Sequence, residues 1–98
     1  IIHVVSIPLE VTMISTSLPM PMQRYALKEA SSALKKFVSQ DKVGKQLSNS
    51  MQKHFGSHWA VFVDQPENNR IVKRTCDMDK YMMFELNRVD FILCQIMR

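Results

Sequence analysis

The sequence contains little glycine, little cysteine and no dense run of charge. Among its 98 residues there are only two glycines and two cysteines, while 46% are apolar and 22% are charged. This composition argues against a disordered or low-complexity segment and is typical of an ordinary globular protein. A chain of this length forms at most one domain, and its own core is small.

The two cysteines do not form a recognisable motif. Cys76 falls in a predicted loop and Cys94 in a predicted strand, without the CxxC spacing of zinc sites and thiol redox motifs. We therefore predict two reduced thiols, no metal and no cofactor, as in a cytoplasmic protein.

The apolar start of the chain is too short to cross a bilayer. The apolar segment from Ile1 to Leu9 contains Pro8 and is ended by Glu10, and it also lacks the basic flank and cleavage pattern of a signal peptide. Because the first residue is not methionine, we expect a fragment of a longer chain or a processed start. We predict a linker or tail over residues 1–10, a domain over residues 11–98 and no membrane partner.

No catalytic pattern is present in the sequence. Ser57 and His58 are adjacent but lack a nucleophile elbow, and Gly56 breaks the helix that would align His54 with His58 as a metal pair. The acidic residue Asp77 does not begin a calcium loop either, because its sixth position is not glycine and its twelfth is not glutamate. We predict no enzymatic activity and no metal site.

The net charge of +4 is modest, and the lysines are spread along the predicted helices. A small basic nucleic-acid-binding domain is the alternative to a protein-interaction module, and a steep loss of affinity for DNA or RNA with rising salt would support it. Saturable binding of an extended peptide would instead support a protein-interaction module. The eight methionines fit either an adaptable core or a Met-lined groove.

Two amphipathic helices are predicted in the first half of the chain. The first runs from about Pro21 to Val38, and the second follows Ser39 as a predicted N-cap and stops at Gly56. The apolar residues of each helix are spaced by three or four, so they share one face. In order along the chain they are Met22, Ala26, Ala30, Ala33, Leu34 and Phe37, then Val43, Leu47, Met51 and Phe55.

The second half of the chain is predicted to form strands. Trp59 to Val63 is apolar on both faces, which indicates a strand that is covered on both sides. After a loop from Asp64 to Asn69, a polar strand is predicted over Arg70 to Thr75, and a second loop over Cys76 to Lys80. The remaining predicted strands are a hairpin of Tyr81 to Leu86 and Val89 to Ile96 that turns at Asn87-Arg88, and a weak strand from Val11 to Ser15.

This order of elements is similar to that of the eight-kilodalton dynein light chains. The resemblance covers roughly residues 11 to 96 as scattered identities in register, and it implies an α+β fold in which two helices pack on a short antiparallel sheet. It also implies a strand-exchanged homodimer, because a partner subunit would cover the second face of the doubly apolar strands. A monomer that buries them against its own helices and N-terminal segment is the alternative. The residues that carry the resemblance are Met22-Gln23, Ala26, Ala30, Ala33-Leu34, Lys36-Phe37, Lys53, Phe55, Trp59, Phe84, Leu86, Val89 and Leu93.

The resemblance also implies which residues meet a partner. The exchanged strand would be Arg70 to Thr75, so the predicted dimer interface is Trp59, Arg70, Ile71, Val72, Lys73, Arg74 and Thr75. Each groove of such a dimer would receive an extended peptide as an added strand, from partners such as dynein intermediate chain-like proteins. The predicted peptide-binding residues are Gln40, Asp41, Val72, Lys73, Arg74, Thr75, Tyr81, Met83, Glu85, Asp90 and Ile92.

Three of these groove residues depart from the family pattern. Met83 and Glu85 stand where the family has aromatics, and Asp90 stands where it has a small apolar residue. Two carboxylates in an apolar groove would place negative charge against a peptide that is removed from water, which is costly unless the charge is paired. We therefore expect the peptide specificity to be altered. With these departures and its preceding segment, the domain resembles the C-terminal half of the tegumental calcium-binding proteins of flukes, in which EF-hands lie upstream. The resemblance thus implies a cytoplasmic protein associated with the cytoskeleton or the tegument.

Overall fold

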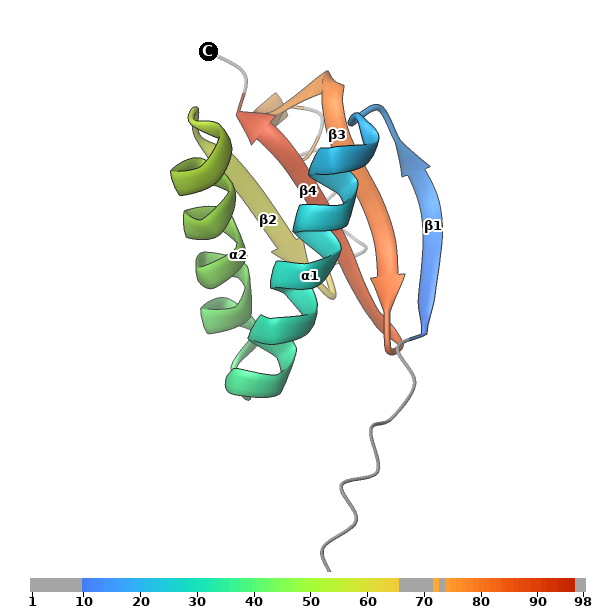
Figure 1. Cartoon of the computed structure of the whole chain (residues 1–98), viewed down its shortest axis with the longest axis vertical. Helices are drawn as coiled ribbons and strands as arrows, with labels where there is room; N and C mark the ends of the chain where they lie inside the picture. The colour runs from blue at the N-terminus through green and yellow to red at the C-terminus, as the bar shows by residue number, and fades with distance from the viewer. Residues whose placement is uncertain (1–9, 66–71, 73, 97–98) are drawn as a thin grey trace, which may run out of the picture.

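Two helices cover one face of a four-stranded antiparallel sheet (Figure 1). The structure is a computed structural model and describes residues 10–65, 72 and 74–96. The strands lie in the order β1-β3-β4-β2, so β1 and β2 form the two edges. The predicted α+β fold is confirmed. Its elements are β1 (Val11–Thr16), α1 (Met20–Lys36), α2 (Gln40–Phe55), β2 (Trp59–Val63), β3 (Cys76–Leu86) and β4 (Val89–Ile96).

Helix α1 contributes small residues to the core. Ala26, Ala30 and Ala33 have no exposed surface, as the spacing of the apolar stripe predicts. The helix begins after Pro19 and ends at Lys36, so the predicted end at Val38 is two residues too late. Val38 is instead fully exposed in the short connection between the helices.

Helix α2 begins and ends close to the predicted positions. Ser39 is its N-cap residue, but the prediction that its hydroxyl accepts a backbone hydrogen bond is wrong, because the Ser39 side chain makes no capping bond. The backbone carbonyl of Ser39 accepts from the Val43 N–H at 3.1 Å instead. At the other end Gly56 has φ 73°, a conformation that favours glycine and ends the helix as predicted.

The hairpin of β3 and β4 forms the centre of the sheet. Its two-residue turn is Asn87-Arg88, and both residues have positive φ, at 51° and 67°. Such a turn matches the right-handed twist of the strands on either side. The Asn87 side chain also accepts a hydrogen bond from the backbone N–H of Glu10 at 2.9 Å, which fixes the start of β1 beside the turn.

Two of the predicted segments differ from the structure. The strand predicted over Arg70 to Thr75 is wrong for its described residues, because Val72, Arg74 and Thr75 are helical, whereas residues 70, 71 and 73 lie outside the described part. An extended segment needs a neighbouring strand for its backbone groups, and a helical turn satisfies them locally within one chain. The loop predicted over Cys76 to Lys80 is also wrong, since these residues begin β3.

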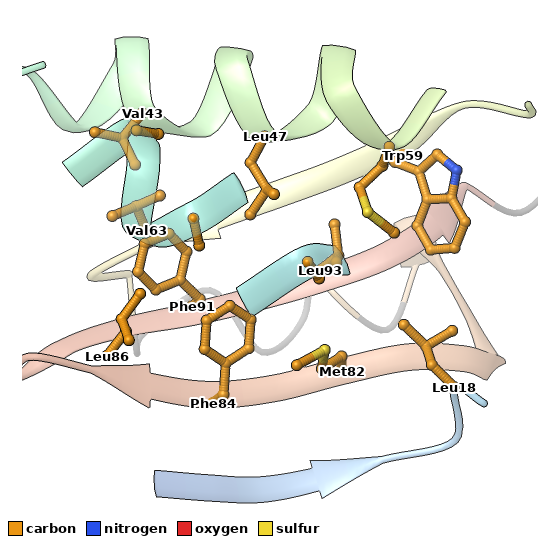
Figure 2. Packing of buried hydrophobic residues seen from close by; sticks show 14 residues of the cluster. Leu18, Val43, Leu47, Trp59, Val63, Met82, Phe84, Leu86, Phe91 and Leu93 are labelled. Atoms are coloured by element: carbon orange, nitrogen blue, oxygen red, sulfur yellow. The ribbon is translucent and has the colours of Figure 1, made fainter. Parts of the chain in front are cut away.

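The main core lies between the helices and the sheet (Figure 2). Val43 and Leu47 point from α2 toward the sheet, where the rings of Phe84 and Phe91 stack with centroids 4.9 Å apart. No described helix has the length and apolar content that a membrane span requires. The labelled core residues are Leu18, Val43, Leu47, Trp59, Val63, Met82, Phe84, Leu86, Phe91 and Leu93.

The close packing of α1 in the core can be tested with Ala30→Leu. Ala30 has no exposed surface, so the larger side chain has to displace its neighbours, and we expect the free energy of unfolding to fall by about 1–3 kcal/mol. Ser32→Leu, on the exposed side of the same helix, is the matched control and should change stability little. Urea unfolding measures both. Equal stabilities of the two variants would show that α1 does not pack closely through Ala30.

Candidate functional site

Strand β2 presents an open edge. It pairs with β4 on one side only, and within the described residues no strand lies on its other side. The Asp64 N–H donates to the Asp90 carbonyl, and the Ile96 N–H to the His58 carbonyl, both at 2.8 Å. Hydrogen-bonded pairs alternate along an antiparallel ladder, so the N–H and C=O groups of Val61 and Val63 point away from β4. This edge is able to receive another strand.

A groove of about 340 Å³ runs between this edge and residues 40–49 of α2. Gln40 and Asp41, which the resemblance to dynein light chains implies as binding residues, line it at the start of the helix. Ser48 lies farther along and donates to the Trp59 carbonyl at 2.6 Å, so it satisfies one of the edge carbonyls. The full lining is Gln40, Asp41, Gly44, Lys45, Ser48, Asn49, Ala60, Val61, Phe62, Val63 and Gln65.

A polar network around Asp64 joins the elements at one end of the groove. Its carboxylate accepts from the Gln40 side-chain amide at 2.9 Å and from the Asp90 N–H at 2.8 Å. These bonds connect the start of α2 to the end of β2 and the start of β4. Gly44 of α2 lies beside the edge, and a Cβ at this position would make an ordinary van der Waals contact with the Val61 carbonyl oxygen, 3.6 Å away.

The other predicted groove residues lie on the outer face of the sheet, away from the helices. In β3 the core residues Met82, Phe84 and Leu86 alternate with a second set, which therefore points to this outer face. The ladder places Met83 opposite Ile92. The predicted residues on this face are Tyr81, Met83, Glu85, Asp90 and Ile92, and the structure brings them together.

A second, smaller cavity of about 190 Å³ opens on this outer face. Ile14 stands at its rim with 57% of its surface exposed, at the point where the register of β1 against β3 shifts. Phe62 and Gln65 line both this cavity and the groove beside α2, so the two hollows meet at the β2 edge. The lining is Ile14, Phe62, Gln65, Met83, Asp90, Phe91 and Ile92.

Two carboxylates face each other on the same surface. Glu85 of β3 is the direct cross-strand partner of Asp90 of β4, and both side chains are half-buried. Like charges directly opposite each other in a sheet are destabilising. A basic group bound between them would relieve this repulsion.

Cys76 and Cys94 form a disulfide, with Cα atoms 5.4 Å apart, so the prediction of two reduced thiols is wrong. The structure brings together two residues that are 18 positions apart in sequence. Val72 packs on this disulfide and is 7% exposed, so a predicted interface residue lies in a small second cluster on the outer face.

The remaining predicted interface residues have varied environments. Trp59 is 4% exposed, and its indole N–H donates to the Gly56 carbonyl at 2.9 Å, so its side chain belongs to the core of its own chain. Arg74 is exposed and Thr75 is half-buried, whereas residues 70, 71 and 73 lie outside the described part. In the described residues, no cluster of three or more histidine, cysteine or acidic side chains is arranged to hold a metal ion.

Several groove residues were not predicted from the sequence. Gly44, Lys45, Ser48 and Asn49 line the groove, but their place depends on the packing of α2 against β2. The doubly apolar pattern of Trp59 to Val63 is the signal that indicates β2 itself. Asp64 gives no local signal, because its partners are 24 and 26 residues away.

The model of the family dynein light chain type 1 matches residues 10–95. Two solved structures of the dynein light chain-like domain of the Fasciola hepatica calcium binding protein FhCaBP2 share the fold. Its mercury derivative has a TM-score of 0.63 at 17% identity, over 90% of this chain and 93% of that chain. A native crystal has a TM-score of 0.69 at 16% identity, over 90% of this chain and 92% of that chain. No curated protein matches this chain.

The family match agrees with the observed architecture. It covers all six helices and strands of the described part except the last residue of β4. Dynein light chains are generally non-enzymatic, and they act through contacts with other proteins. This chain therefore belongs to the dynein light chain family, and its domain is a protein-interaction module.

Proposed function

We propose that the domain forms a homodimer and binds extended segments of partner proteins by β-strand addition. The observation that carries this proposal is the open edge of β2, where the backbone groups of Val61 and Val63 point into a groove beside α2. Main-chain hydrogen bonds at such an edge provide affinity for an extended segment whatever its side chains.

The outer face of the sheet supports the dimer. Ile14, Phe62, Met83 and Ile92 form an apolar surface around the cavity next to this edge. A second copy of the chain would cover this surface on both partners at once through a two-fold axis. In this arrangement a strand from each copy pairs with the β2 edge of the other, and the free side of that added strand then receives the extended peptide. The segment 70–75 is the proposed exchanged strand, and its helical residues would have to extend first.

The function can be tested with the natural chain. Sedimentation of the chain alone tests dimerisation, and calorimetry with short extended peptides tests strand addition at the groove. We expect saturable peptide binding that persists as salt is raised, because main-chain hydrogen bonds depend little on ionic strength. A chain that neither dimerises nor binds any extended peptide would contradict the proposal. The proposed location remains the cytoplasm, in association with the cytoskeleton or tegument.

The opposed carboxylates Glu85 and Asp90 should set the specificity of the site. We expect the natural domain to prefer peptides with lysine or arginine and to bind glutamine-centred motifs weakly. The double change Glu85→Tyr and Asp90→Ala should lower binding of basic peptides about fivefold, since a partly exposed ion pair contributes up to about 1 kcal/mol. It should also raise binding of glutamine-centred peptides. A peptide array measures both changes. Tight binding of glutamine-centred peptides by the natural domain, unchanged in the variant, would show that these carboxylates do not face the peptide.

A further inference from the structure

The disulfide lies beneath the segment that strand exchange would require. Cys76 is 1% exposed and Cys94 has no exposed surface. Val72 covers them from four positions before Cys76, the spacing at which two residues share one face of a helical turn. We call the helical residues Val72, Arg74 and Thr75 the Val72 turn. Four apolar residues of the outer face pack against the same cluster, namely Ala60, Phe62, Tyr81 and Ile92.

The start of β3 has few other attachments to the sheet. Cys76 is opposite Ile96 and Tyr81 is opposite Cys94, so five steps along β3 correspond to two steps along β4. Met78, Asp79 and Lys80 are exposed in this irregular stretch. The disulfide is therefore the covalent tie that keeps Cys76, and with it the Val72 turn, on the outer face.

The helical and extended conformations of this segment exclude each other. In a helix four residues advance about 6 Å, so Val72 lies back over Cys76. In a strand they advance about 13 Å, which would take Val72 away from the disulfide. A chain whose Val72 turn covers its own sheet cannot offer the same residues as a strand to a second copy.

We propose that the Cys76–Cys94 disulfide is a redox switch that holds the chain in its closed, single-chain form. This inference rests on the proposed dimerisation and adds its regulation. Reduction would release the Val72 turn, uncover Phe62 and Ile92 on the outer face, and free the segment to extend. The oxidised chain therefore dimerises with low affinity, and the reduced chain with high affinity.

The reductant is a dithiol, and the exchange balances. One thiolate of the dithiol attacks a sulfur of the Cys76–Cys94 bond, forms a mixed disulfide and releases the other cysteine as a thiolate. The second thiol of the reductant then displaces the first cysteine. The reductant ends as a disulfide, and its two protons end on Cys76 and Cys94. Because both sulfurs are buried, the Val72 turn has to open before the first attack.

The first test compares the two redox states of the natural chain. Sedimentation is measured after air oxidation and after reduction with dithiothreitol, with the thiol content checked by mass. We expect the dimer dissociation constant of the reduced chain to be about tenfold lower than that of the oxidised chain. The closed state cannot pair, so the apparent affinity falls in proportion to the fraction of chains that remain open. The double variant Cys76→Ser and Cys94→Ser should behave like the reduced chain without any reductant. Equal dimerisation in both states would overturn the switch while leaving the dimer intact, whereas monomers in both states would overturn the proposed function itself.

The second test probes the Val72 turn directly. Val72→Asn places an unpaired polar group against the buried disulfide without adding charge near the attacking thiolate, and we expect dithiothreitol to reduce this variant about tenfold faster than the natural chain. Val38→Asn is the matched control, because Val38 is fully exposed and far from either cysteine in sequence. It should be reduced at the natural rate. Equal rates for the two variants would show that the turn does not cover the disulfide, and would overturn the proposal.

Discussion

Replacing Val61 with proline should weaken dimerisation and peptide binding about tenfold or more while leaving the domain folded. The Val61 N–H points toward the open edge of β2 and not toward β4, so proline removes a donor that only an incoming strand would use. The unpaired carbonyl of that strand would cost about 1–3 kcal/mol. Sedimentation and peptide calorimetry measure the loss.

Ala60→Pro is the matched control for this result. The Ala60 N–H lies in the ladder with β4, opposite Cys94, so proline here removes a hydrogen bond of the sheet itself. We expect Ala60→Pro to lower the free energy of unfolding much more than Val61→Pro. Full dimerisation and full peptide binding by Val61→Pro would show that the β2 edge receives no strand.

The largest loss of stability should come from Phe84→Ala. Phe84 has no exposed surface, and its ring stacks on Phe91 in the centre of the core. Removing it should cost about 3–5 kcal/mol, of a total that is typically about 5–15 kcal/mol for a domain. Urea unfolding should show a much lower midpoint. Met78→Ala, at a half-exposed residue of the same strand, should change stability by less than about 0.5 kcal/mol. Similar losses in both variants would contradict the assigned core.

The helices and the central hairpin could be predicted because their signals are local. The stripe that contains Ala26, Ala30 and Ala33 faces the sheet as its spacing indicates, and Gly56 ends α2. Asn87-Arg88 forms the expected turn between β3 and β4. In each case the signal lies within a few neighbouring residues.

The segment from residue 70 to Cys76 could not be predicted in the same way. Its β-branched and basic residues suit a polar strand, but a strand requires a neighbour, and no described strand of the chain pairs with this segment. The disulfide joins residues 18 apart, and no local spacing indicates this pair. Both errors concern the same place, because Val72 packs on the Cys76–Cys94 bond.

The candidate site shows the same division between local and long-range signals. The alternation along β3 and β4 places Tyr81, Met83 and Ile92 on one face, as the resemblance to dynein light chains implies. The groove beside β2 depends on the packing of α2 against β2 and on the bonds of Asp64, which connect distant parts of the chain.

Sedimentation equilibrium of the natural chain under reducing conditions tests the proposed dimer most directly. At micromolar concentration the mass should be about twice the 11.4 kDa of one chain, as a closed two-fold assembly requires. Raising the concentration further should not increase it beyond the dimer. A mass of 11.4 kDa that persists at the highest concentration would contradict the proposal that a second copy covers the outer face and pairs with the β2 edge.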